Sequence, residues 1–75
     1  MIDKVKKFFE MEYNEARDAC DYEYAKPEMI VNYTIQRCLG VALFVQTATD
    51  VSLDEIREVY TKYRKKLERL KNDDW

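Results

Sequence analysis

Turn-forming residues are almost absent from this chain, and this feature limits its possible folds more than any other. Its 75 residues include one proline, Pro27, and one glycine, Gly40. Gly and Pro are the strongest local signals for turns, and no segment shows the apolar–polar alternation of a half-buried strand. The sequence therefore predicts a small all-α three-helix bundle, a single helical domain over residues 1–75. Its helices are expected at about residues 3–23, 27–47 and 53–71, with a central hydrophobic second helix.

Two helix boundaries have local chemical causes. The residue before Pro27 is biased away from helical backbone angles, while Pro27 itself fits the first turn of a helix, where its missing N–H costs no hydrogen bond. Ser52 and Glu55 have the S-x-x-E spacing of a capping box. Val51 and Ile56 stand at the two positions of a hydrophobic staple around it. The third helix is therefore predicted to begin directly after Ser52.

Apolar residues at steps of three and four give the outer two helices one buried side each. In the first helix this side comprises Val5, Phe9, Tyr13, Ala16 and Cys20. In the third helix the spacing is that of a heptad repeat, which packs one helix along another. Its members are Leu53, Ile56, Tyr60, Tyr63, Leu67 and Leu70.

The second helix contains the most apolar stretch of the chain, CLGVALFVQ at residues 38–46. A membrane-spanning helix needs about 20 consecutive apolar residues, and Arg37 and Asp50 bound this stretch, so no membrane span is predicted. A buried strand is an alternative because β-branched and aromatic residues are frequent here, but the chain offers no partner strand. On a helical wheel the segment has a broad apolar arc, which is expected to face both neighbouring helices. The arc comprises Ile30, Val31, Tyr33, Ile35, Cys38, Val41, Ala42, Phe44 and Val45.

Arg37 falls inside this apolar arc. A partly buried guanidinium needs a carboxylate, because an unpaired buried charge is costly. In an antiparallel hairpin that turns near residue 25, position 37 lies opposite position 13. Glu12 is therefore the predicted partner in a structural ion pair, with Glu10 and Glu15 as alternatives.

The opposite side of the second helix is polar but also carries Met29, Gly40 and Leu43 beside Gln36, with Leu39 at the margin. Their steps of seven, four and three residues resemble a helix-packing repeat, and Gly40 would permit close backbone approach. Scattered surface apolar residues are the competing interpretation. A chain of this size has a marginal core, which favours a homodimer. The sequence thus predicts a non-enzymatic interaction module that self-associates through its second helix.

The alternative function is a small nucleic-acid-associated or regulatory protein. It would use the basic C-terminal half of the third helix, which interleaves cations with tyrosines. The predicted contacts are Lys62, Arg64, Lys65, Lys66, Arg69 and Lys71. Against it, the formal net charge is -2 and the same helix begins with Asp54, Glu55 and Glu58, which would repel phosphate.

Catalytic and metal-binding chemistry have little support. The chain has no histidine and two cysteines, without a CxxC or other zinc-ligand spacing. The carboxylates of Glu12, Glu15, Asp18 and Asp21 step by three residues and fan around a helix instead of converging on a cation. We therefore expect no catalytic residues, cofactor or metal. The N-terminal sequence lacks the pattern of a signal peptide, and thin cysteine usage predicts a cytoplasmic protein with reduced thiols.

Overall fold

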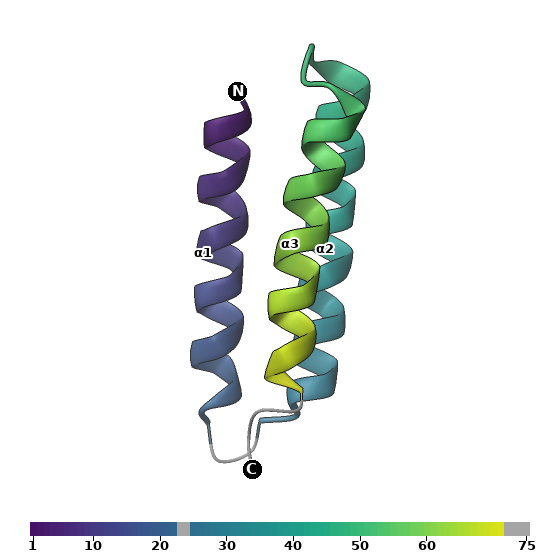
Figure 1. Cartoon of the computed structure of the whole chain (residues 1–75). Helices are drawn as coiled ribbons and strands as arrows, with labels where there is room; N and C mark the ends of the chain where they lie inside the picture. Colours follow the sequence, from purple (N-terminus) through teal and green to yellow (C-terminus); the bar gives the residue numbers. More distant parts are fainter. Residues whose placement is uncertain (23–24, 72–75) are drawn as a thin grey trace.

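The computed structural model describes residues 1–22 and 25–71, which form three helices: α1 (Ile2–Cys20), α2 (Pro27–Ala48) and α3 (Leu53–Leu70). Within these ranges there is no β-strand. In Figure 1, α1 and α3 run in one direction and α2 runs in the other. Each helix packs against the other two, in a rod of 42 × 17 × 15 Å. The predicted all-α three-helix bundle is confirmed.

The two chemically marked boundaries are also confirmed. α2 begins at Pro27, and α3 begins at Leu53 with Ser52 as its N-cap. The Glu55 amide donates to Ser52 Oγ at 3.2 Å, and the Ser52 hydroxyl donates to the Glu55 carboxylate at 3.2 Å. This cap satisfies an amide that the first helical turn leaves without a partner.

The other ends differ slightly from the prediction. α1 stops at Cys20, whereas the sequence suggested residue 23, which lies outside the described residues. Its last amides bond three residues back, Asp21 to the Asp18 carbonyl and Tyr22 to the Ala19 carbonyl, which tightens and closes the final turn. α2 runs one residue beyond the expected end, to Ala48, and α3 stops at Leu70, one residue early.

The core consists of two clusters along the bundle. The larger comprises Val5, Phe9, Cys38, Ala42, Val45, Ile56, Val59 and Tyr63, and the smaller comprises Ala16, Val31, Ile35 and Leu67. Phe9 and Tyr63 meet edge to face with ring centroids 5.9 Å apart. Val59 is buried although it lies outside the predicted heptad, because α3 contacts two helices and its buried side is wider than a single heptad line.

The predicted apolar arc of α2 is too wide. Tyr33 is 65% exposed and Phe44 is 68% exposed, whereas both were expected to face the bundle. The arc that α1 and α3 cover includes Val31, Cys38 and Val45 and stops short of these two aromatic residues. α2 is therefore apolar on its buried side and partly apolar on its solvent side. Among the described helices none has the length and apolar character required to cross a bilayer.

Candidate functional site

The solvent side of α2 carries a row of residues that recur at steps of four and three. Such spacing keeps residues on one side of a helix and is the repeat by which helices pack together. We name this row the outer ridge; it comprises Met29, Tyr33, Gln36, Gly40, Leu43 and Thr47. All of its members are exposed.

The structure brings the predicted interface residues together on this ridge. Met29, Gln36, Gly40 and Leu43 are exposed on one side of α2, and Leu39 is half-buried at its edge. Two aromatic residues that sequence reasoning placed in the core, Tyr33 and Phe44, lie exposed with them. The signal that identifies Tyr33 is its spacing of four from Met29 and seven from Gly40.

Gly40 has no role in packing the bundle. A Cβ built at this position meets no heavy atom within 4 Å, and the backbone is helical without a positive φ. Glycine in a helix interior is less stable than alanine by about 0.5–1 kcal/mol. The helix therefore contains a destabilising residue for which the contacts within the described chain supply no reason.

Shallow apolar grooves flank the outer ridge on both sides. The groove between α1 and α2 lies beside the N-terminal half of the ridge. Its lining includes Ala16, Ala19 and Ile30, with Glu12, Glu15 and Arg37. The groove between α2 and α3 lies beside the C-terminal half, and Leu39, Leu53 and Tyr60 line it. The apolar surface thus extends beyond α2 itself.

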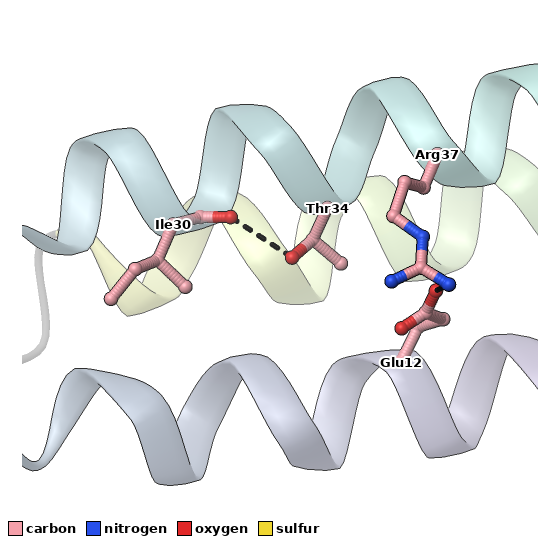
Figure 2. Close-up of polar contacts among 4 residues, drawn as sticks. All are labelled: Glu12, Ile30, Thr34 and Arg37. Atoms are coloured by element: carbon pink, nitrogen blue, oxygen red, sulfur yellow. Dashed lines mark hydrogen bonds and ion pairs between the residues drawn. The ribbon is translucent and has the colours of Figure 1, made fainter.

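The predicted ion pair closes the α1 side of this surface. Arg37 Nη2 lies 2.8 Å from Glu12 Oε1, and Figure 2 shows the two side chains meeting between α1 and α2. Glu12 Oε1 accepts no aligned hydrogen bond, so the contact is held by charge at short distance. The Arg37 guanidinium also lies 5.9 Å from the Tyr33 ring centroid. Nearby, the Thr34 hydroxyl donates to the Ile30 carbonyl at 2.9 Å, within α2.

A second polar contact, which was not predicted from the sequence, joins α1 to α3. The Tyr63 hydroxyl donates to Glu10 Oε2 at 2.5 Å, and Lys66 Nζ lies 3.6 Å from the same oxygen. The hydrogen bond from Tyr63, with the positive charge of Lys66, lowers the pKa of Glu10 below its ordinary value. Burial and the bond to Glu10 raise the pKa of Tyr63 to about 12.

The six basic residues predicted for nucleic-acid contact fall into two groups. Three make contacts within the chain: Lys66 Nζ lies 4.3 Å from the Tyr13 ring centroid, Lys62 Nζ lies 5.5 Å from that of Tyr63, and Lys71 pairs with Glu68 at 3.3 Å. The other three, Arg64, Lys65 and Arg69, are exposed along α3.

Two groups with nucleophilic atoms, the Cys38 thiol and the Tyr63 phenol, are protonated at neutral pH. Burial, together with the negative charge of Glu12, raises the pKa of the Cys38 thiol to about 11. Tyr63, with its pKa near 12, is likewise a neutral phenol. In the part of the chain that the structure describes, no group of three or more His, Cys, Asp or Glu residues is arranged to hold a metal ion.

The exposed side chains of Met29, Tyr33, Leu43 and Phe44 thus lie on one side of α2, beside the two grooves. No protein-family model, curated protein or solved structure matches this chain.

Proposed function

We propose that this chain is a non-enzymatic helical interaction module that forms a homodimer through the outer ridge of α2. The observation that carries the proposal is the concentration of large exposed apolar side chains on one side of one helix: Met29, Tyr33, Leu43 and Phe44. A surface helix normally carries charged and polar residues on the side that faces solvent, so large apolar side chains there indicate a second packing partner. The bundle covers only one side of α2, and a second copy would cover the other.

Two further features support self-association. Gly40 sits in the middle of the ridge, where the absence of a side chain lets another helix approach closely. A bundle of three short helices also has a small core, and association buries additional apolar surface. A cytoplasmic location belongs to the same proposal: Cys38 forms no disulfide, and reducing compartments keep thiols in this state.

The test is light scattering after gel filtration, on the wild-type chain and on two matched variants. Leu43→Glu places a charge on the ridge at a position that is 53% exposed. Met11→Glu makes the same kind of change on α1 at a position that is 51% exposed. We expect the wild type and Met11→Glu to be dimers and Leu43→Glu to be a monomer with an unchanged helical circular dichroism spectrum. A monomeric wild type at high micromolar concentration contradicts the proposal.

The alternative function, binding of nucleic-acid phosphates by α3, is supported by the exposure of Arg64, Lys65 and Arg69 along one helix. It is weakened by the internal contacts of the remaining basic residues, which leave fewer cations to displace counterions. Each phosphate contact contributes about 0.9 to the slope of log affinity against log salt on duplex DNA, so three contacts would give a slope near -3. An electrophoretic shift at low salt, with an affinity that falls at this slope as salt is added, would favour the alternative.

A further inference from the structure

We infer that two copies of this chain pair with their α2 helices antiparallel, about a two-fold axis near residue 38, with Phe44 of each copy in the α1–α2 groove of the other. The inference rests on the proposed function and specifies its geometry. A surface that binds its own copy about a two-fold axis is isologous, so the same residues serve on both sides. The two α2 helices can then lie parallel or antiparallel, and their charges distinguish the two arrangements.

Opposite charges stand at the two ends of the outer ridge. Lys26 is the N-cap of α2 and Asp50 follows its C-terminal end; both are exposed, and neither belongs to an ion pair in the described part of the chain. Parallel helices would place Lys26 beside Lys26 and Asp50 beside Asp50. Antiparallel helices place Lys26 of each copy beside Asp50 of the other. Antiparallel packing also aligns the helix dipoles favourably.

Glu28, the other charge in the first turn of α2, does not cancel this pattern. It precedes Met29 in the helix and therefore points about 100° away from the ridge. The ridge itself carries no charged residue between Met29 and Thr47. Electrostatic complementarity of this kind sets orientation and register more than it sets affinity.

The outer ridges of two copies are complementary when the helices are antiparallel and the register is centred near residue 38. Met29 then lies opposite Thr47 of the other copy, and Tyr33 lies opposite Leu43. Gln36 lies opposite Gly40, where open space on the glycine accommodates the longer side chain. The side chains of Met29 and Tyr33 and the open space at Gly40 therefore each have a complementary neighbour in the other copy. Because of the two-fold axis, every contact occurs twice.

Phe44 and the α1–α2 groove complete the fit. Phe44 lies seven residues from Arg37 and hence on the same side of α2, the side where Arg37 meets Glu12 of α1. In the antiparallel two-fold arrangement, the α1 side of one copy faces the α1 side of the other. Phe44 then lies opposite position 32 of its partner, next to the groove that Ala16, Ala19 and Ile30 line.

The area required for a stable dimer supports this use of the groove. A standard interface buries about 800 Å² on each partner, more than a ridge one helix wide supplies over 22 residues. Seating an aromatic ring in a groove of the partner adds contact on both copies at once. Buried aromatic anchors of this kind dominate the energetics of many interfaces.

Disulfide trapping tests the arrangement. Met29→Cys and Thr47→Cys are prepared separately, mixed and oxidised mildly, and cross-linked peptides are identified by mass spectrometry. A disulfide requires Cα atoms within about 7 Å. We expect a 29-to-47 link between the two variants and no link within either variant alone, because identical positions lie about 27 Å apart at 1.5 Å per residue.

Each outcome is decisive. A 29-to-29 or 47-to-47 link would establish a parallel dimer, which overturns the inference and leaves the proposed function standing. A dimer by light scattering with no link in any combination means that another face is used, and contradicts both. As a second readout, Phe44→Ala is expected to weaken dimerisation tenfold or more, whereas Tyr22→Ala, which removes another exposed aromatic ring, leaves it within twofold. Equal effects of the two changes would remove Phe44 from the interface.

Discussion

The carboxylate of Glu12, whose side chain is 4% exposed, lies 2.8 Å from the guanidinium of Arg37, whose side chain is 48% exposed. The pair therefore joins a fully buried charge to a half-exposed one, and the two ends are not equivalent. Arg37 keeps contact with water, while Glu12 depends on Arg37 for compensation of its charge. Replacement of Arg37 should therefore lower the stability of the fold more than is usual for a half-exposed residue.

Arg37→Leu is expected to lower the free energy of unfolding by about 2 kcal/mol, because it leaves a buried carboxylate without a counter-charge. This loss of stability is smaller than that for a fully buried ion pair, because about half of the Arg37 side chain is exposed to solvent. Urea denaturation followed by circular dichroism measures the change. Glu12→Leu combined with Arg37→Leu should recover most of the loss, as apolar replacement of both partners removes the uncompensated charge.

Arg17→Leu is the matched control for that measurement. Arg17 pairs with Asp18 at 3.7 Å, and both side chains are exposed. Exposed pairs contribute about 0–1 kcal/mol, so a small change is expected. Equal losses for Arg17→Leu and Arg37→Leu would show that the burial of Glu12 has no energetic consequence.

The Tyr63–Glu10 contact predicts how stability depends on pH. The pKa of Tyr63 is raised from 10.0 to about 12 in the folded chain, so its contribution is complete below pH 10 and is lost as the pH rises toward 12. The pKa of Glu10 is lowered from 4.5, so its contribution is present above that pH and is lost on further acidification. Unfolding free energies measured across both ranges test this dependence.

Tyr63→Phe should reduce the alkaline loss of stability, leaving the part that comes from Cys38, whose pKa is raised to about 11. It should also cost about 1 kcal/mol at neutral pH, the usual contribution of one hydrogen bond. Tyr60→Phe on the same helix is the control and should leave the profile unchanged. An alkaline loss of unchanged size in Tyr63→Phe would assign the whole titration to another group.

Cys38 is predicted to resist alkylation in the folded protein. Its thiol is buried and its pKa is about 11, so little thiolate exists at pH 8 and reagent access is poor. Iodoacetamide labelling followed by peptide mass mapping should show slow modification of the Cys38 peptide, accelerated at least a hundredfold in denaturant. Rapid labelling of Cys38 in the native protein would contradict the packing around α2.

Gly40→Ala is predicted to have opposite effects on the monomer and the dimer. The added Cβ meets no atom of the chain, so the monomer should gain about 0.5–1 kcal/mol from the better helix former. The same methyl group would hinder close approach of a second helix and weaken dimerisation. Thermal unfolding of the monomeric Leu43→Glu background and light scattering of the wild-type background separate the two effects. A variant that is stabilised and dimerises normally would exclude close approach at Gly40.

Exchange of the charges at the two ends of α2 tests the orientation of the paired helices independently of cross-linking. Lys26→Asp and Asp50→Lys are each expected to weaken an antiparallel dimer at low salt, and the double change should restore it, because the opposite charges meet again. Equilibrium sedimentation at two ionic strengths measures the effect, which screening should reduce at high salt. If the double variant were the weakest of the three, the charges would not face one another.

Local sequence rules predicted the helices and their starts because their causes lie within a few residues. Pro27 and Ser52 act on the turn that follows them, whatever the rest of the chain does. The Glu12–Arg37 pair could also be anticipated, because the length of the turn between α1 and α2 sets their register. The width of the arc of α2 that α1 and α3 cover could not be anticipated. The prediction therefore placed Tyr33 and Phe44 in the core.

The sequence by itself thus determined an all-α chain, its division into three helices and the axial register of the first two. Only the tertiary structure decided how each helix is rotated about its own axis, because rotation results from the packing of all three helices at once. That rotation exposes Phe44, brings Tyr63 and Lys66 to Glu10 across α1 and α3, and leaves Gly40 facing solvent. The outer ridge is therefore encoded in the spacing of α2, but its exposure is a property of the assembled bundle.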